Sequence, residues 1–350
     1  MYTKKINTAI ASFGLSGQVF HAPFVQAHPG FNLIGIVERH KNLSRNEYQH
    51  TKLYRSFEEI LKDDEVELVV VNTPVQTHFE YTKKAIESGK HVIVEKPFTV
   101  SEDEAIILTQ LASERNTKSI VYQNRRYDGD FLKLKEILRS QQLGKIKEVE
   151  MRFDRYRPEK SSKQHKEAAI PGAGILHDIG AHLIDQAIIL FGMPQSVFAD
   201  IDILRDGGEA NDYFEIILKY NDGLRVRLVS TVFALGNHFE YRFHGSQGSF
   251  LQKRSDVQEQ ALTHGLRPGM GKWMPDNIQF DGELFTFQNH VTHHQNTTSS
   301  QGNYMHFYND VYEYITLNKA NPIPFSDAVK TMKIIDIALK SSSNGCFIDL

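Results

Sequence analysis

The stretch Ser12-Phe13-Gly14-Leu15-Ser16-Gly17 joins a strand-like run, Asn7–Phe13, to a helix-like segment, Gln18–Ala27. Glycines at this spacing, between a strand and a helix, are typical of loops whose backbone N–H groups bind a pyrophosphate. Two of the three usual glycines are present, and a serine stands where the first is expected. The stretch therefore predicts a nucleotide-binding loop. The alternative is a glycine turn with a purely structural role.

Short β-branched runs alternate with helix-like segments from Ile6 to about Tyr122. The apolar character is continuous in Leu68–Val71 and Val92–Val94, which indicates strands that are covered on both faces and hence a parallel sheet. The strand-like runs after the first are Asn32–Glu38, Glu67–Asn72, His91–Glu95 and Ser119–Tyr122. We therefore expect residues 1–123 to form a doubly wound α/β domain of the Rossmann type.

The pattern changes beyond residue 123 to longer strands of alternating polarity that are joined by turns, as at Tyr220–Leu224. Such alternation is typical of an antiparallel sheet with one buried face. An amphipathic helix is predicted over Gly174–Phe191, and two more helices near 304–317 and 326–341. The polar residues 256–300 are expected to be looped. Residues 124–350 are therefore predicted to form an α+β domain with a mainly antiparallel sheet.

The composition of the 350 residues narrows the classes of partner and compartment. Forty basic and forty-three acidic residues give a formal net charge of -3, so the totals indicate no basic face and no nucleic acid partner. The single cysteine allows no internal disulfide. No apolar run approaches the roughly 18 residues of a membrane span, and no signal sequence is recognised. We expect a cytoplasmic protein without a membrane partner.

The second strand-like run ends in Val37-Glu38-Arg39-His40-Lys41, about 20 residues beyond the glycines. At this position an acid binds the ribose hydroxyls of NAD, or basic groups bind the 2′-phosphate of NADP. Both kinds of side chain are present. Because Arg39 and Lys41 offer two cations to a dianionic phosphate, NADP is favoured and NAD stays open.

Other candidate cofactor residues stand at the carboxyl ends of the predicted parallel strands, where ligands bind open α/β sheets. They comprise Asn72, Thr73 and Pro74 after the third run, and His78 at the start of the next helix. The predicted cofactor set is Ser12, Gly14, Ser16, Gly17, Glu38, Arg39, Lys41, Asn72, Thr73, Pro74, His78, Glu95 and Lys96.

Lys96 follows a buried strand and precedes Pro97, a place where a surface lysine is not the ordinary interpretation. Oxidation of an alcohol requires loss of a hydroxyl proton, and a positioned cation stabilises the alkoxide charge that develops. We therefore expect Lys96 to be catalytic. Its peptide bond to Pro97 is a candidate for the cis form.

Asp178 and His182 lie four residues apart on the predicted helix, a spacing that puts two side chains on one face. Imidazole is the usual general base near neutral pH, and the aspartate could bind a neighbouring hydroxyl or orient the ring. The alternative is a pair that only satisfies the helix. No metal is expected, since no second ligand set with familiar spacing accompanies the pair. The histidines of His290–His294 are expected to face solvent.

Four segments together resemble the Gfo/Idh/MocA oxidoreductase family, and the resemblance covers essentially the whole chain. They are Ser12–Pro23, Glu95–Pro97, Gln123–Tyr127 and Gly174–His182. The chain is most similar to the branch of NADP-linked inositol dehydrogenases and uncharacterised bacterial relatives, which share the Phe20–Pro23 and Phe153–Pro158 segments.

The resemblance implies a Rossmann domain followed by a domain with an open-faced sheet, and a homodimer or homotetramer formed through that sheet. It implies Lys96, Asp178 and His182 as the catalytic trio. It also offers Asn124, Arg125 or Arg126, and Tyr156 as substrate contacts.

The sequence therefore predicts an NAD(P)-dependent dehydrogenase that acts on a small polyhydroxylated molecule, such as an inositol or a sugar. The competing hypothesis is a sensor of the same fold that binds nucleotide without turnover. The presence of Lys96, Asp178 and His182 favours the enzyme. A third possibility, reduction of an aromatic or tetrapyrrole substrate, requires an apolar pocket and is disfavoured by the polar residues near Asp154–Arg157.

Overall fold

The computed structural model describes residues 4–236, 238–271, 273–274 and 279–350. The chain divides into two compact units. The first contains residues 1–124, 257–275 and 303–329, and the second contains 125–256, 276–302 and 330–350. The sequence predicted a single boundary after residue 123. The structure instead returns two later segments to the first unit, and no local pattern in the sequence indicates this return.

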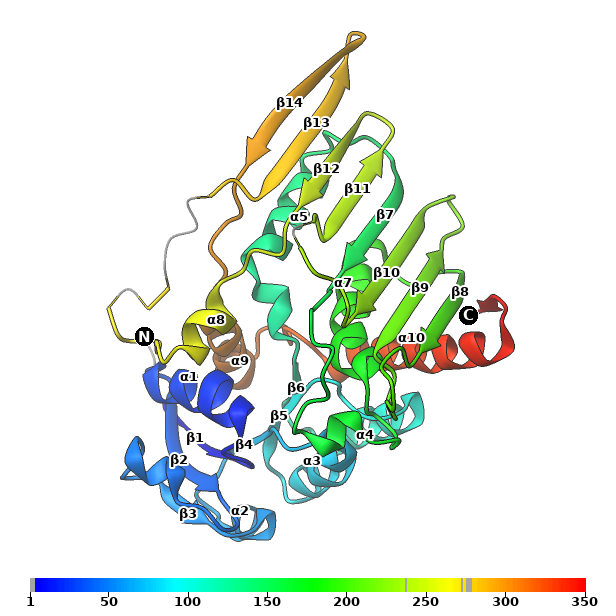
Figure 1. Ribbon diagram of the computed structural model, residues 1–350. Coiled ribbons are helices and arrows are strands. Elements are labelled where there is room, and N and C mark those ends of the chain that lie inside the picture. The colour runs from blue at the N-terminus through cyan, green and yellow to red at the C-terminus, as the bar shows by residue number, and fades with distance from the viewer. Residues whose placement is uncertain (1–3, 237, 272, 275–278) are drawn as a thin grey trace. The chain divides into compact units, whose positions relative to one another are not determined.

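The first unit is built on a six-stranded parallel sheet with the strand order β3-β2-β1-β4-β5-β6 (Figure 1). This order is that of a dinucleotide-binding fold. The strands β4 and β5 are buried along nearly their whole length, which explains their continuous apolar sequence. The strands are β1 (Ile6–Ile10), β2 (Phe31–Val37), β3 (Lys52–Tyr54), β4 (Leu68–Val71), β5 (His91–Glu95) and β6 (Ser119–Tyr122).

Helices connect these strands and begin where the sequence provides caps. The Ser101 side chain accepts a hydrogen bond from the backbone N–H of Glu104, whereas Thr77, at the corresponding position before α3, makes no such bond to its helix. The helices are α1 (Ala22–Ala27), α2 (Phe57–Lys62), α3 (His78–Glu87), α4 (Glu102–Glu114), α8 (Gln258–Thr263) and α9 (Met305–Leu317). Shorter turns are η1 (Gly17–His21), η2 (Leu43–Asn46) and η3 (Val75–Thr77). The turn η4 (Asn124–Tyr127) ends the first unit and begins the second.

The late segments join the first unit through aromatic packing. Tyr308 of α9 stacks on Phe24 of α1 with ring centroids 5.4 Å apart, and Trp273 meets the edge of the same ring. Buried aromatic pairs of this kind contribute about 0.5–1.5 kcal/mol beyond their buried area. The C-terminal part of the chain therefore completes the core of the nucleotide-binding unit.

The second unit is built on a nine-stranded sheet with the order β14-β13-β12-β11-β7-β10-β9-β8-β15. Its pairs are antiparallel except for β10 with β7, so the predicted mainly antiparallel sheet is confirmed. The strands are β7 (Ile146–Arg152), β8 (Ser196–Asp202), β9 (Tyr213–Lys219), β10 (Arg225–Thr231), β11 (Tyr241–Gly245), β12 (Gly248–Gln252), β13 (Gly282–Gln288), β14 (Val291–Thr297) and β15 (Ile348–Asp349).

Two strands of this sheet lie where the sequence predicted loops. Residues 256–300 contain α8 and the hairpin of β13 and β14, whose turn residues Asn289 and His290 have positive φ. The β14 sequence is polar and exposed over most of its length, so it lacks the alternation that marks a half-buried strand. The prediction of a loop there was wrong for that reason.

One face of the second sheet is covered by helices within its own unit. Alternate residues of β9, Phe214, Ile216 and Leu218, are fully buried. The helices of this unit are α5 (Gly129–Arg139), α6 (Gln164–Glu167) and α7 (Ala181–Phe191), which follows the π-helical turn η5 (Leu176–Gly180). The helix α10 (Phe325–Asn344) begins in the first unit and belongs to the second from Lys330. Among the described residues, no helix is long and apolar enough to cross a membrane.

Candidate active site

The glycine loop of the first unit is fixed by contacts that only a glycine permits at its last position. A Cβ on Gly17 would lie 2.2 Å from the backbone oxygen of Ser12. That oxygen accepts a hydrogen bond of 2.8 Å from the side-chain amide of Asn72, at the end of β4. The Ser12 hydroxyl in turn accepts from the backbone N–H of Gly14 at 3.3 Å. Serine therefore fits the place of the usual first glycine.

The same loop is open where a ligand would approach. Gly14 is exposed, and a Cβ there would meet only the Ser12 hydroxyl at 3.6 Å. The side-chain oxygen of Asn72 is buried without a hydrogen-bond partner among the described residues. An orphaned acceptor beside an open glycine loop fits a bound dinucleotide, because buried polar groups are normally satisfied.

A buried network links this loop to the end of β5. The Glu95 carboxylate accepts hydrogen bonds from the Ser16 hydroxyl at 2.6 Å and from the His21 ring at 3.0 Å. The other ring nitrogen of His21 lies 2.8 Å from the Tyr308 hydroxyl. Hydrogen bonding to His21 lowers the pKa of Glu95 even though burial opposes this. The residue before Lys96 is therefore held in place by the cofactor loop itself.

Lys96 begins the turn that follows β5, and its peptide bond to Pro97 is cis, as the sequence suggested. His78 supports this turn. Its two ring nitrogens lie 2.8 Å from the backbone oxygens of Pro97 and Thr73. His78 is only 1% exposed, and both of its ring nitrogens are used by backbone oxygens. The predicted direct contact of His78 with a cofactor is therefore replaced by a structural role, in which its ring supports the turn after β5. Burial lowers its pKa.

The Thr73–Thr77 turn is closed by its own hydroxyls. The Thr73 and Thr77 hydroxyls lie 2.6 Å apart, and Thr77 donates to the backbone oxygen of Pro74 at 2.7 Å. The turn is therefore shaped before any ligand binds, with Thr73 and Pro74 at the carboxyl end of the parallel sheet.

In the loop after β2, the acidic candidate for cofactor binding is buried and the basic candidates are exposed. The Glu38 carboxylate accepts hydrogen bonds from the backbone N–H groups of Leu43 and Ser44, at 2.9 and 2.8 Å, and from the Ser44 hydroxyl at 2.5 Å. Glu38 is 6% exposed, whereas Arg39 and Lys41 are exposed. The predicted role of Glu38 as a ribose ligand is therefore replaced by a structural one, since its carboxylate is used inside the loop.

In the second unit, Asp178 lies in the π-helical turn η5, and His182 lies in the first turn of α7. The predicted helix exists, but it begins with a wider turn of a kind that is frequent at functional sites. The side chain of Asp178 is 24% exposed and pairs with Lys166 at 2.9 Å. His182 is 3% exposed.

A glycine before this turn is required by the packing of a neighbouring side chain. Gly174 has φ +86°, and a Cβ there would lie 2.6 Å from the Asn211 side chain. Asn211 accepts a hydrogen bond from the backbone N–H of Leu176 at 2.8 Å. The small residue therefore lets Asn211 hold the start of η5.

Two of the weaker substrate candidates, Arg125 and Arg126, are engaged in ion pairs within the second unit. Arg126 donates two hydrogen bonds, of 2.8 and 2.6 Å, to the carboxylate of Asp185. Arg125 pairs with buried Asp128 at 3.1 Å. The other two candidates are Asn124, which is 6% exposed and closes the first unit, and Tyr156, which is 55% exposed. These contacts explain why two arginines stand here without requiring a substrate.

Sequence reasoning missed the basic groups around Asp178. Besides Lys166, the Arg155 guanidinium lies 3.9 Å from the Asp178 carboxylate. Lys163 and His165 are close enough for Asp178 to raise their pKa values against stronger opposing effects. The basic run Lys163-Gln164-His165-Lys166 was a visible signal, although a solvated surface is the ordinary interpretation of such a run.

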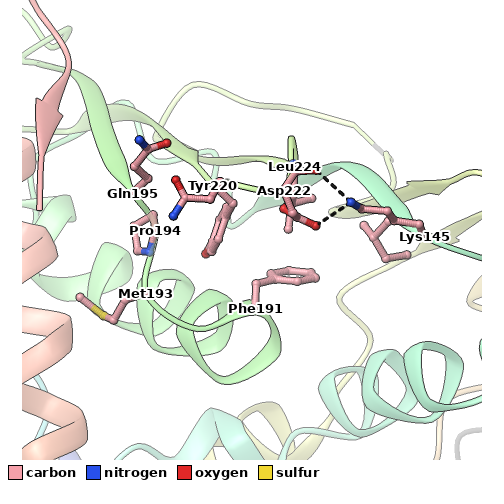
Figure 2. A pocket seen from close by; sticks show the side chains of 10 residues that line it. Lys145, Phe191, Met193, Pro194, Gln195, Tyr220, Asp222 and Leu224 are labelled. Carbon is pink, nitrogen blue, oxygen red and sulfur yellow. Dashed lines mark hydrogen bonds and ion pairs between the residues drawn. The ribbon is translucent and has the colours of Figure 1, made fainter.

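A groove of about 410 Å³ lies elsewhere in the second unit (Figure 2). It lies at the far end of α7, where Phe191 ends the helix, so the 11-residue helix, about 16 Å long, lies between it and the turn η5 that carries Asp178. Lys145 and Asp222 meet at one side. The groove is therefore separate from the Asp178 cluster. Among the described residues, no three acidic, histidine or cysteine side chains form a group that could hold a metal ion.

Two family models together match most of the chain. Residues 6–123 match the NAD-binding Rossmann fold of an oxidoreductase family, and residues 135–350 match the C-terminal alpha/beta domain of the same family. The expected resemblance to this family is confirmed. An NAD(P)-binding Rossmann domain is present, and the chain is an oxidoreductase.

Similar proteins cover nearly the full length. An uncharacterised oxidoreductase of Schizosaccharomyces pombe is 39% identical over 370 residues, covering 99% of each chain. The scyllo-inositol 2-dehydrogenase (NADP(+)) IolW of Bacillus subtilis is 33% identical over 337 residues, covering 96% of this chain and 94% of its own. The crystal structure of an oxidoreductase from Bacillus cereus is 28% identical, covers 99% of both chains and superposes with a TM-score of 0.90.

Proposed function

We propose that this chain, a sequence that belongs to the Gfo/Idh/MocA oxidoreductase family, transfers a hydride between a nicotinamide and a hydroxyl or ketone carbon of a polyol, inositol or sugar. The observation that carries the proposal is the coexistence of a preformed dinucleotide loop with Lys96, Asp178 and His182. The similarity to a scyllo-inositol dehydrogenase over nearly the whole chain supports the substrate class.

The proposed roles follow from the chemistry of alcohol oxidation. When bound, the nicotinamide supplies the hydride acceptor or donor. The His182 ring takes the hydroxyl proton, because imidazole exchanges protons near neutral pH. The Lys96 ammonium stabilises the alkoxide charge on the substrate oxygen. Asp178 binds a neighbouring hydroxyl or orients the imidazole. In the reverse direction, His182 returns the proton and a ketone is reduced.

We propose NADP as the preferred cofactor, and the use of Glu38 inside its own loop supports this. A carboxylate that already accepts three hydrogen bonds is withdrawn from the ribose hydroxyls that NAD presents. The exposed cations Arg39 and Lys41 remain available for a 2′-phosphate.

Steady-state kinetics of the purified chain with inositols and aldoses, with NADP and with NAD, test both proposals. We expect turnover with a higher kcat/KM for NADP. The double variant Arg39→Gln, Lys41→Gln should lose about 100-fold or more in kcat/KM with NADP and little with NAD, since hydrogen bonds to charged groups contribute about 1.5–3 kcal/mol each. A preference for NAD that the double variant leaves unchanged would contradict the NADP assignment. Absence of turnover by a chain that binds NADP would favour the sensor.

We also propose that a second copy of this chain packs on the uncovered face of the second-unit sheet. Phe214, Ile216 and Leu218 of β9 are buried on the helix-covered face, so the other face carries charged side chains together with Tyr213 and Ile217. Glu150 lies at its centre, with the guanidinium groups of Arg227, Arg242 and Arg152 at 3.0, 3.5 and 3.8 Å. An interface of this kind weakens in salt. Light scattering should show a dimer or tetramer at low salt, and a monomer at every concentration would contradict the proposal.

A further inference from the structure

The carboxylate of Asp178 lies among basic side chains. One oxygen is 2.9 Å from the Lys166 ammonium, and the other is 3.9 Å from the Arg155 guanidinium. All three side chains are partly accessible, at 24% for Asp178, 39% for Lys166 and 24% for Arg155. A molecule in solution can therefore reach this group of charges.

Two further basic side chains share the position. Partial burial lowers the pKa of Lys163, and the charges of Lys166, Arg157 and Arg155 lower it further. His165 responds in the same way, to burial first and then to Lys166 and Lys163. Asp178 opposes the shift in both cases. One carboxylate thus faces several basic groups that repel one another.

The segment that carries these groups is fixed by polar contacts. The Glu167 carboxylate pairs with Arg205 at 3.1 Å, and Arg205 also donates to the backbone oxygen of Arg157 at 2.7 Å. The backbone oxygen of Lys166 accepts from Gly174 at 3.1 Å. The acidic residue nearest in sequence is therefore already paired with Arg205. The basic groups are held near Asp178 by the loop itself.

We propose that the substrate of this site carries an anionic group, a carboxylate or a phosphate ester, that binds to Lys163, Lys166 and Arg155 beside Asp178. The inference rests on the proposed function and narrows its substrate class. Like charges held together cost free energy that a bound anion offsets, whereas the hydroxyls of a neutral polyol do not. The substrate is thus a sugar acid, a carboxylated polyol or a sugar phosphate.

Kinetics with three sugars of matched ring hydroxyls test the inference: glucose, glucose 6-phosphate and glucuronate, each with NADP. The phosphate and carboxylate arms identify which anion is preferred. We expect one anionic sugar to exceed glucose in kcat/KM by at least about 10-fold, the size of one charged hydrogen bond. The double variant Lys163→Gln, Lys166→Gln should remove that advantage, mainly by raising the KM of the anionic sugar, so that its kcat/KM falls by a larger factor than that of glucose.

The matched control is Lys160→Gln on the same segment, since Lys160 lies near Glu209 at 3.9 Å and is not among the groups that act on Lys163 or His165. It should keep the anion preference. Equal use of glucose and both anions, or a double variant with an unchanged preference, would overturn the inference. A double variant that raises the KM of NADP equally with every sugar would also overturn it, because the cations would then serve the cofactor.

Calorimetric binding separates this inference from the proposed reaction. Glucose 6-phosphate and glucuronate should bind the intact chain more tightly than glucose, and the double variant should lose that difference. Such binding without turnover of any sugar would contradict the proposed function and retain the anion site. Turnover of neutral sugars without anion binding would do the reverse.

Discussion

The candidate site residues of the first unit are fixed by short hydrogen bonds to their surroundings. The basic side chains around Asp178 belong to one loop segment and remain partly exposed to solvent. Glu38, Asn72 and Glu95 each make hydrogen bonds of 2.5–3.0 Å to the backbone or to neighbouring side chains. Asp178 instead pairs with the long side chains of Lys166 and Arg155, which are 39% and 24% exposed. The difference teaches that the candidate cofactor residues are fixed by the fold before a ligand binds, whereas the proposed substrate preference would depend on a few partly exposed side chains of one segment.

The largest effect should come from the glycine loop. Gly17→Ala places a Cβ 2.2 Å from the Ser12 oxygen, so the loop must move. Such overpacking costs about 1–3 kcal/mol. We expect a lower melting temperature together with loss of NADP binding in a fluorescence titration. Gly14→Ala is the matched control, because its nearest neighbour would be 3.6 Å away. It should keep the melting temperature and weaken only NADP binding. Equal melting temperatures for the two variants would contradict a preformed loop.

A smaller effect is expected from the network behind Glu95. Tyr308→Phe removes the hydroxyl that donates to Phe20 at 2.9 Å and lies 2.8 Å from His21. The free energy of unfolding should fall by about 2 kcal/mol, since buried polar groups lose partners. NADP affinity should fall too, because His21 helps hold Glu95. Tyr312→Phe, which loses one bond to Lys4 at 3.0 Å, is the control and should leave NADP affinity unchanged. Unchanged NADP affinity in both variants would contradict the expectation that the hydrogen-bond network behind Glu95 supports cofactor binding.

The last prediction concerns stability alone, at a buried acid of the second unit, and would show that this unit also contains groups fixed by burial. Burial raises the pKa of Asp130 to about 6, and Asp128 adds to the shift. Between pH 4 and 6 the folded state therefore binds more protons than the unfolded state, and stability falls as the pH rises. Asp130→Asn should be more stable than the wild type at pH 8, by on the order of 2 kcal/mol, and equal at pH 4. Urea unfolding at both values measures this. A constant difference would contradict the buried, raised pKa.

The sequence predicted the parts of the fold that repeat a local pattern. The continuous apolar runs became the central strands of the first sheet, and the alternating runs became β7 to β12. It failed for β13 and β14, whose exposed residues carry no alternation. It also missed that α9 returns to the first unit, because Tyr308 packs on Phe24 across 284 residues of chain.

The sequence was enough to select the candidate site residues, but it did not predict which hydrogen bonds their side chains make. The glycine loop and Lys96 follow from spacing and position, whereas the engagement of Glu38 with Ser44 depends on how one turn folds. The same holds for His78, whose ring is used by two backbone oxygens. Short polar side chains can serve a ligand or their own loop equally well, and only the structure distinguishes these uses.

The transfer of deuterium tests the central claim most directly. A polyol labelled with deuterium at the reacting carbon is incubated with NADP and either the wild-type chain or Lys96→Ala. The mass of the nicotinamide product is then measured by mass spectrometry. The account predicts deuterated NADPH from the wild type and a loss of rate of about 100-fold or more in the variant, with NADP affinity unchanged. Equal transfer by both proteins would contradict the role of Lys96. NADPH formed without deuterium would contradict direct hydride transfer.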